Sequence, residues 1–418
     1  MQKNQPARPE WDNSFRMALG LYLSVPFCRT KCTYCNFASD VFSRSAFERY
    51  VERVCAEVHS TARTAEQMGG RLEKDVDSIY LGGGTPTILD CLQLERLFVT
   101  IRQNFRLGPE TEITVECAPG TLTPVVLERL LKCGVNRVSL GVQSFVDQEA
   151  ASVGRLHKRT TVLEDLAHLR TAGISNINLD LIAGLPHQTM ESWQWSLIEA
   201  MAAKAPHVSV YMLEVDEDSR LGRELIAGGT KYHAHFVPDD ELIADLYLAA
   251  CEQLERAGIK QYEISNFARA GFESRHNLKY WTRQPYLGFG VDAHSMLPAT
   301  DNDLEAVRFS TAAVLDRYVT GSAPIRSKVS FRSGLEESFF LGLRLTKGVD
   351  LSELATKFGN EALRHHAGTI QEFAQDGLLE VEGECIRLTP RGRLLSNEVF
   401  AEFVAEPTVP VTNENKSA

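Results

Sequence analysis

The chain has no apolar run long enough to cross a membrane, and no apolar segment near its start of the kind that signal peptides carry. It also has no basic surplus, because 44 Lys and Arg residues face 55 Asp and Glu residues, for a formal net charge of −11. Proteins that bind a nucleic-acid backbone usually carry a basic surplus or stripe, so we do not expect nucleic acid as a partner. These absences predict a cytoplasmic protein with reduced thiols.

The composition is that of a globular protein, with 44% hydrophobic and 24% charged residues. A length of 418 residues is more than one compact core usually holds, so two or three domains are expected. The patterns divide the chain into five parts, which are an N-terminal extension (1–19), an α/β region (20–250), a connecting segment (251–329), a second compact unit (330–403) and a disordered tail (404–418).

Six short apolar runs recur in the α/β region, each followed by a Gly- or Pro-marked turn and a helical pattern. They lie at 21–25, 78–83, 112–117, 137–142, 177–184 and 208–213. The runs show little strict alternation, as expected for parallel strands covered on both faces. Six such units predict a parallel α/β sheet, and a partial (β/α) barrel and an open doubly wound sheet both fit. In either fold, the functional residues should gather at the carboxyl ends of the strands.

The second half of the chain does not continue the alternation of short apolar runs and helical patterns. A long helical pattern at 239–259 leads into a loop-rich segment at 264–295. The unit at 330–403 begins with a helical pattern at 336–345 and ends with a pattern of hairpin then helix. That order predicts a small α+β, winged-helix-like domain.

Three cysteines stand close together in the loop after the first predicted strand, with the spacing Cys28-x3-Cys32-x2-Cys35. Thiolates suit zinc or iron–sulfur clusters. A closed structural zinc site needs four protein ligands, and cluster ferredoxins supply four cysteines in a tight run. Here Phe37 stands two places after the third cysteine. Three protein ligands and an open position suit a metal centre that must also bind a small molecule.

This spacing, in a loop after the first strand of a parallel α/β unit, resembles the radical S-adenosylmethionine (SAM) superfamily. The resemblance implies a partial (β/α)6 barrel and a [4Fe–4S] cluster held by Cys28, Cys32 and Cys35. It also implies that the free iron chelates the amino and carboxylate groups of SAM. An electron from the cluster can then cleave SAM to a 5′-deoxyadenosyl radical.

Polar residues at the ends of the predicted strands extend the resemblance to the oxygen-independent coproporphyrinogen III oxidases and their relatives. The SAM-binding residues that it implies are Tyr22, Tyr34, Gly83, Gly84, Thr85, Glu116, Gln143, Arg155 and Asp180. Arg155 would pair with the SAM carboxylate. Judged as residues alone, Glu116 and Asp180 are charges inside apolar runs that need a partner, and a structural salt bridge would serve as well.

Three features distinguish among these relatives. The oxidases carry a fourth cysteine where this chain has Phe37, and they have a longer region before the first strand. The segment His276-Asn-Leu-Lys-Tyr-Trp281 resembles the His-Asn-x-x-Tyr-Trp motif of the heme chaperones called HemW. The resemblance implies heme handling by His276, Tyr280 and Trp281, with His276 as a candidate axial ligand. A loop anchored by these side chains is the alternative, and His294 and the His365–His366 pair are other candidate ligands.

The resemblance therefore implies a heme chaperone that delivers heme to apo-hemoproteins such as respiratory enzymes. A flavodoxin or ferredoxin as electron donor, a peripheral membrane association and a homodimer are compatible with it. Two alternatives are enzymes, an oxygen-independent coproporphyrinogen III dehydrogenase and a heme-modifying radical SAM enzyme such as a heme-degrading methyltransferase. Whether the chain is an enzyme is left open by the residues. A tRNA-modifying enzyme is disfavoured by the acidic charge.

Overall fold

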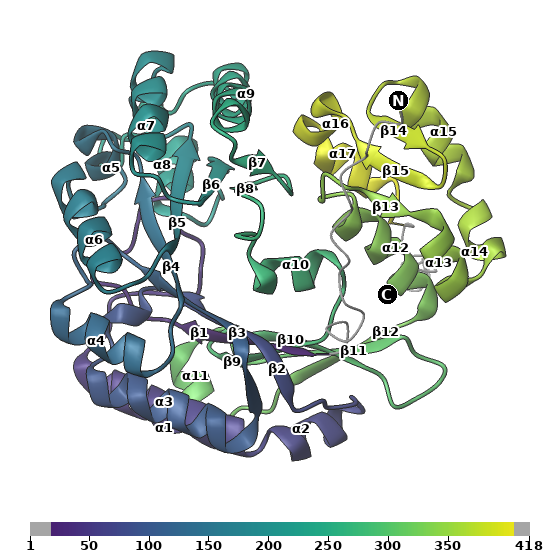
Figure 1. Cartoon of the computed structure of the whole chain (residues 1–418), viewed down its shortest axis with the longest axis horizontal. Coiled ribbons are helices and arrows are strands. Elements are labelled where there is room, and N and C mark those ends of the chain that lie inside the picture. The colour runs from purple at the N-terminus through teal and green to yellow at the C-terminus, as the bar shows by residue number, and fades with distance from the viewer. Residues whose placement is uncertain (1–17, 405–418) are drawn as a thin grey trace, which may run out of the picture. The chain divides into compact units, whose positions relative to one another are not determined.

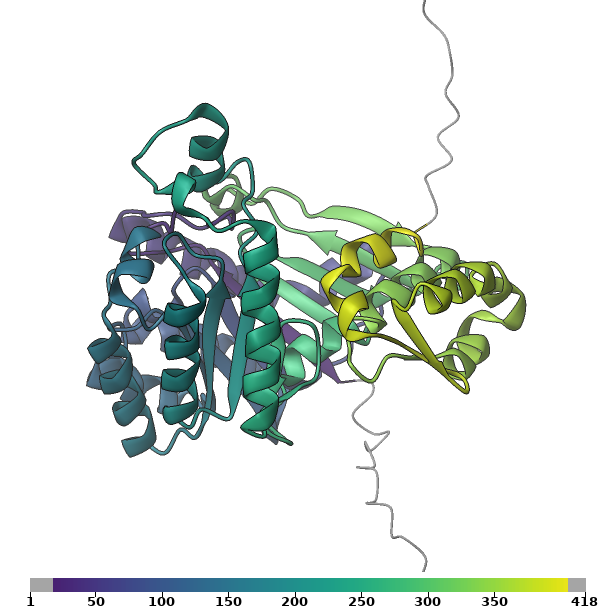
Figure 2. The ribbon, with the colours of Figure 1, turned by 90° about the horizontal axis from the view of Figure 1, so that it is seen from above.

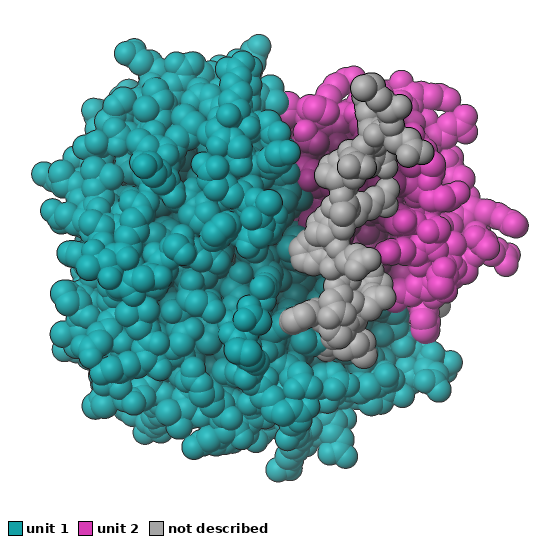
Figure 3. Space-filling view, in the orientation of Figure 1, with its two compact units in different colours: residues 1–329 teal, residues 330–418 magenta. Residues whose placement is uncertain are grey.

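The computed structural model describes residues 18–404, which form parts of two compact units, 1–329 and 330–418 (Figure 3). Nearly all of the expected extension at 1–19 and of the expected tail at 404–418 lies outside the described residues. None of the helices within 18–404 is long and apolar enough to cross a membrane.

The first unit is built on one sheet whose central strands are parallel and follow chain order. These strands are β1 (Leu19–Val25), β2 (Asp75–Gly83), β3 (Arg106–Cys117), β4 (Arg137–Gln143), β5 (Asn176–Ala183) and β6 (His207–Met212). A doubly wound sheet would reverse its strand order at a switch point, and this sheet does not. The curved sheet with helices on its convex side confirms the partial (β/α)6 barrel (Figure 1).

Three of the helices between these strands begin at residues whose side chains cap them. Asp90 and Thr189 each form a capping box, and Thr123 caps a helix whose first residue is Pro124. The helices are α1 (Arg44–His59), α2 (Thr61–Met68), α3 (Cys91–Asn104), α4 (Pro124–Lys132), α5 (Asp147–Ser152), α6 (Arg159–Thr171) and α7 (Met190–Ala202), with the 3-10 turn η2 (Pro86–Ile88).

Side chains of the barrel strands alternate between two chemically different faces. One face is aliphatic and buried, and includes Ile79, Leu81, Ile113, Val115, Val138, Leu140, Leu179, Leu181, Val208 and Val210. The other face is polar, and its members contact one another across the strands; they include Ser78, Tyr80, Glu116, Ser139, Asn178, Asp180 and Ser209. The expectation of little alternation missed this pattern, because Tyr80 and the strand glycines blur it when residues are sorted only by hydrophobicity.

The segment after β6 extends the same sheet. It contains α8 (Arg220–Ala227), η3 (Ala234–Phe236), α9 (Asp240–Arg256), β7 (Lys260–Gln261), β8 (Asn266–Ala268), α10 (Arg275–Trp281), β9 (Tyr286–Gly290), β10 (His294–Pro298), β11 (Ala306–Ser310), α11 (Leu315–Val319) and β12 (Ile325–Val329). β8 pairs with β6, and β9 pairs with β1. Residues 251–329, presented by the sequence as a connecting segment, are therefore part of the first unit.

The loop-rich interpretation of 264–295 was wrong for the histidine motif. Residues 275–281 form helix α10, capped by Ser274, whose Oγ accepts a hydrogen bond from the backbone N–H of Asn277. This helix lies on the concave side of the sheet (Figure 1), while α9 runs along the side of the barrel strands (Figure 2). The short length of the helix, seven residues, explains why periodicity alone did not reveal it.

The second unit is a small α+β domain. It contains α12 (Phe331–Gly342), β13 (Val349–Asp350), α13 (Leu351–Phe358), α14 (Asn360–Arg364), α15 (Ala367–Gln375), β14 (Leu379–Glu382), β15 (Cys385–Leu388), α16 (Pro390–Leu394) and α17 (Ser396–Ala401). Its three strands form an antiparallel sheet in the order β13-β15-β14. Helices followed by a hairpin and further helices match the expected winged-helix-like order.

Candidate functional site

The three-cysteine loop leaves the carboxyl end of β1 and is held at both ends by backbone contacts. The N–H of Cys28 donates to the carbonyl of Asp40 at 3.0 Å, which closes the loop on itself. The N–H of Thr33 donates to the carbonyl of Val153 at 3.1 Å, and the N–H of Leu221 donates to Thr33. The thiols are therefore presented by a loop that neighbouring segments hold in place.

The three thiols lie close enough to interact electrostatically. Burial raises the pKa of the Cys28 and Cys35 thiols, and the charge of Cys32 raises both further. Within residues 18–404, no group of three His, Cys, Asp or Glu side chains is placed to hold one metal ion. A [4Fe–4S] cube binds its thiolates at separate irons, so three neighbouring thiols fit a cluster without converging on one point.

Arg155 lies next to the cluster loop. Its Nη1 donates a hydrogen bond of 3.5 Å to the Cys32 thiol, and its Nη2 donates to the carbonyl of Gly141. The predicted SAM-carboxylate partner therefore stands beside a predicted cluster ligand.

The glycine-rich turn after β2 packs against the start of the cluster loop. The N–H of Gly84 donates to Val25 at 2.8 Å, and the N–H of Thr85 donates to Phe27 at 2.7 Å. A Cβ on Gly84 would lie 2.5 Å from the Phe27 carbonyl oxygen, so only glycine fits there. Gly83 has a φ of +94°, and the Thr85 hydroxyl donates to the Cys28 thiol at 4.0 Å. The structure brings these three predicted residues to the cluster loop.

Gln143 ends β4 in a backbone conformation that few non-glycine residues adopt. Its φ is +67°, and the pairing of β4 with β5 shifts register between Gly141 and Gln143. Such a bulge redirects a side chain at the end of a strand, and bulges are common next to active sites. The side chain of Gln143 is buried at this end of the barrel.

Glu116 and Asp180 form a pair of half-buried carboxyl groups on the polar face. The hydroxyl of Tyr80 donates to Glu116 at 2.8 Å, while Ser139 and Asn178 donate to Asp180 at 2.9 and 2.7 Å. Burial raises the pKa of Glu116 to about 7, with a contribution from the charge of Asp180, and burial also raises the pKa of Asp180. Neither carboxylate forms a salt bridge among the described residues, so the salt-bridge alternative is not what the structure has.

The two predicted tyrosines occupy different surroundings. Tyr34 stands in the thiol loop itself, between Cys32 and Cys35, and packs on a buried hydrophobic cluster that includes Val153 and Leu221. Tyr22 lies on β1, and its ring centroid is 6.1 Å from that of Tyr80 and 6.2 Å from that of His276. Tyr22 therefore connects the SAM set to the histidine motif.

His276 is only 1% exposed, and both of its ring nitrogens have partners. Nδ1 lies 3.1 Å from Ser78 Oγ, and Nε2 lies 2.9 Å from Tyr280 Oη. Burial lowers the pKa of His276 to about 3, so the imidazole is neutral at physiological pH. Trp281 ends the helix, with its ring 6.4 Å from that of Tyr280. The motif is brought to the polar face of the barrel, with the histidine engaged by protein groups.

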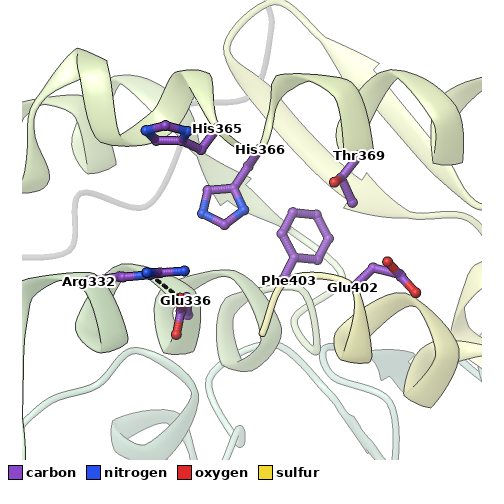
Figure 4. Close-up of a pocket in the computed structure, with 7 residues that line it drawn as sticks. All are labelled: Arg332, Glu336, His365, His366, Thr369, Glu402 and Phe403. Atoms are coloured by element: carbon purple, nitrogen blue, oxygen red, sulfur yellow. Dashed lines mark hydrogen bonds and ion pairs between the residues drawn. The ribbon is translucent and has the colours of Figure 1, made fainter. Parts of the chain in front are cut away.

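The other candidate histidines lie elsewhere. His294 is exposed and lies 4.0 Å from Asp292. His365 and His366 line a pocket of about 370 Å³ in the second unit, in which His366 points toward the centre and Arg332 pairs with Glu336 at 3.0 Å (Figure 4). The ring of His366 is 4.8 Å from that of Phe339 and 5.8 Å from that of Phe403.

Several residues of the polar face were missed from the sequence. They are Ser78, Tyr80, Gly82, Ser139, Asn178, His207 and Tyr262, which contact predicted site residues directly or through one or two intermediates. A Cβ on Gly82 would lie 2.9 Å from the Glu116 carboxyl, so this glycine makes room for it. Polar residues at every second position of otherwise aliphatic strands were the signal that could have identified most of them.

Comparison with known proteins identifies the family of the chain. Residues 22–197 match the Radical SAM superfamily model, and residues 333–395 match the HemN C-terminal domain model. The heme chaperone HemW of Bacillus subtilis is 35% identical over 92% of this chain and 99% of its own length. The heme chaperone HemW of a Synechocystis strain is 34% identical over 94% of this chain and 98% of its own.

A solved structure shows the same architecture. Coproporphyrinogen III oxidase (HemN) from Escherichia coli, described as a radical SAM enzyme, superimposes with a TM-score of 0.78 at 25% identity and covers 93% of this chain and 90% of its own. The chain therefore belongs to the radical SAM superfamily and, within it, to the family of the HemW proteins.

Proposed function

We propose that this protein is a heme chaperone, which binds heme and transfers it to apo-hemoproteins such as respiratory enzymes. The observation that carries the proposal is the similarity to curated heme chaperones over nearly the full length of both chains. Phe37 adds support, because it stands where the oxidases have a fourth cysteine. Its side chain is 63% exposed, so packing in the core does not explain why phenylalanine stands at this position. We place this activity in the cytoplasm, where thiols stay reduced.

Within this proposal, Cys28, Cys32 and Cys35 hold a [4Fe–4S] cluster with SAM at its open iron. When bound, the two groups supply one-electron chemistry that can generate a carbon radical. Arg155 orients the SAM carboxylate by a charge-assisted hydrogen bond, and Gly83, Gly84 and Thr85 line the approach to the cluster. Glu116, Gln143 and Asp180 bind the ribose and amino groups, while Tyr22 and Tyr34 form the wall around cluster and adenosine. An electron donor such as flavodoxin or ferredoxin would reduce the cluster.

The heme-handling role falls to helix α10. The atom of His276 that would ligate iron is Nε2, which would exchange the Tyr280 hydroxyl for the metal. Its low pKa keeps the imidazole in the neutral form that binds metals. Because His276 is buried, ligation requires α10 to move away from the sheet, and Tyr280 and Trp281 then offer aromatic surface to the porphyrin. Delivery at a membrane surface and a homodimer are compatible with this role.

A second candidate function is oxygen-independent coproporphyrinogen III dehydrogenase, a radical SAM oxidative decarboxylation. The observation that favours it is the match to the HemN fold over 93% of the chain. A heme-modifying radical SAM enzyme would use the same cluster and cofactor. Phe37 and the HemW similarity favour the chaperone over both enzymes.

A paired assay on anaerobically reconstituted protein tests the choice. One arm titrates heme and then adds an apo-hemoprotein, and the other supplies coproporphyrinogen III, SAM and reductant. The chaperone predicts stoichiometric heme binding, transfer to the apoprotein and no porphyrinogen conversion. Formation of protoporphyrinogen would establish the dehydrogenase, and consumption of heme with SAM would establish a heme-modifying enzyme. Protein reconstituted without SAM is the matched control for both arms.

A further inference from the structure

A continuous chain of hydrogen bonds, partly shielded from solvent, runs from Asp180 to the start of helix α10. Asn178 Nδ2 donates to Asp180 Oδ1 at 2.7 Å, which leaves Asn178 Oδ1 as an acceptor. His207 Nδ1 lies 2.6 Å from that oxygen, and His207 Nε2 lies 2.9 Å from the hydroxyl of Tyr262. The hydroxyl oxygen of Tyr262 accepts the backbone N–H of Ser274 at 3.2 Å. Ser274 is the capping residue of α10.

The donors and acceptors along this chain have only one consistent arrangement. Burial holds the pKa of His207 well below its usual range, so its ring is neutral and carries one N–H. That N–H must be on Nδ1, because Asn178 presents an acceptor there. Nε2 is then an acceptor, so the Tyr262 O–H donates to it and a lone pair of Tyr262 is available to Ser274. A change at one end alters the acceptor strength along the whole chain.

The same helix is held from a second side by the predicted SAM set. Tyr80 donates to Glu116 at 2.8 Å, and its ring centroid lies 5.5 Å from that of His276. Tyr22 is a second aromatic neighbour of His276, and their ring centroids are 6.2 Å apart. The histidine of α10 therefore lies against Tyr22 and Tyr80, while the start of α10 is joined to Asp180 through Tyr262, His207 and Asn178.

We propose that His207 and Tyr262 are positioning residues that link helix α10 to Asp180, so that occupation of the SAM site changes the stability of this helix. The inference rests on the SAM site of the proposed function, and it adds that SAM binding regulates that function. SAM binding replaces the present surroundings of Asp180, and the hydrogen-bond chain carries the change to the N-terminus of the helix that bears His276. Since His276 must leave its buried position to meet heme iron, SAM then governs access of heme to the motif.

Backbone amide exchange tests the link without any heme. In reconstituted wild-type protein, we expect SAM to change the exchange rate of the amides of residues 275–282 about fivefold or more, the lower end of typical coupling between sites. Tyr262→Phe removes the hydroxyl that joins His207 to Ser274 and nearly preserves the ring packing. In this variant SAM should still bind, but its effect on the α10 amides should disappear.

Tyr247→Phe is the matched control. Tyr247 is also buried, and its hydroxyl donates to the carbonyl of Ile264 at 2.6 Å and accepts from Gln261 Nε2 at 2.7 Å. This variant should keep the wild-type response to SAM. An unchanged exchange rate in wild-type α10 on SAM binding, or a full response in Tyr262→Phe, would overturn the proposal, whichever way the variants affect stability. Because heme is absent, failure of this test is distinct from failure of the chaperone function.

Discussion

The guanidinium of Arg155 donates a hydrogen bond to the thiol of Cys32, although 123 residues separate the two in the chain. Arg155 follows α5, while Cys32 lies in the loop after β1, so the partial barrel brings them together. The contact joins a predicted cofactor ligand to a predicted cluster ligand.

The cluster assignment predicts that serine at any one of the three loop cysteines prevents cluster assembly. Cys28→Ser, Cys32→Ser and Cys35→Ser should each lose the broad visible absorbance of the cluster after anaerobic reconstitution, because a hydroxyl is a much poorer ligand for iron. Iron and sulfide content should fall in parallel. Cys91→Ser, at a partly exposed cysteine outside the loop, is the control and should keep the cluster. A cluster retained in all three loop variants would refute the assignment.

Arg155→Ala should weaken SAM binding while the cluster remains. A hydrogen bond to a charged group contributes roughly 1.5–3 kcal/mol, which corresponds to about ten- to a hundredfold in affinity. Calorimetric titration of the reconstituted protein with SAM measures the change, and Arg155→Lys should lie between the alanine variant and the wild type. Equal SAM affinity in wild type and Arg155→Ala would remove Arg155 from the site.

Glu116 predicts a specific pH dependence of stability. Its pKa of about 7 in the folded protein is above the ordinary value of 4.5. Its contribution to the free energy of unfolding is therefore fully present below pH 4.5 and is lost as pH rises through 7. Glu116→Gln keeps an acceptor for Tyr80 but cannot ionise. The variant should therefore be more stable than wild type at pH 8, by at most about 3 kcal/mol, and by much less at pH 5.

Urea unfolding of the cluster-free protein at the two pH values measures this difference. Glu110→Gln, at an exposed carboxylate, is the control and should show no comparable pH-dependent gain. If Glu116→Gln is less stable than wild type at pH 8, the ionised carboxylate does not destabilise the folded protein and the prediction is wrong.

Gly84→Ala should disrupt the contact between the glycine-rich turn and the cluster loop. The new Cβ would lie 2.5 Å from the Phe27 carbonyl oxygen, and a backbone atom cannot move away cheaply. Overpacking of this kind costs about 1–3 kcal/mol, and the displaced turn should also lower SAM affinity. Gly108→Ala is the control, because no atom lies within 4 Å of its Cβ position. Unfolding and SAM titration that are the same for both variants would contradict the predicted close approach.

His276→Ala tests the heme-ligand prediction against two other histidine sites. We expect this variant to alter the Soret spectrum of bound heme and to slow transfer to an apo-hemoprotein, while His294→Ala and His366→Ala behave as wild type. Circular dichroism checks that the buried substitution leaves the fold intact. If only His366→Ala changes the spectrum, the pocket of the second unit binds heme instead. If none of the three does, His276 serves only to anchor α10.

Much of the barrel could be predicted from the chain because its signals are local. Each apolar run with its turn and helical pattern predicted one β/α unit, and β1 to β6 lie in the sheet in that order. The histidine motif was missed as a helix because α10 is a single short helix of seven residues, too brief for a periodic pattern to distinguish it from a loop.

The sequence by itself determined that three thiols would stand together after the first strand, because their spacing is short enough for one loop to present them all. Only the tertiary structure decided what surrounds them. The Arg155–Cys32 contact, the bulge at Gln143 and the chain from Asp180 to Ser274 each depend on strand register, which is set by pairing between distant segments. The burial of His276 has the same origin, because a residue's exposure depends on which segments fold over it and not on its neighbours in the chain.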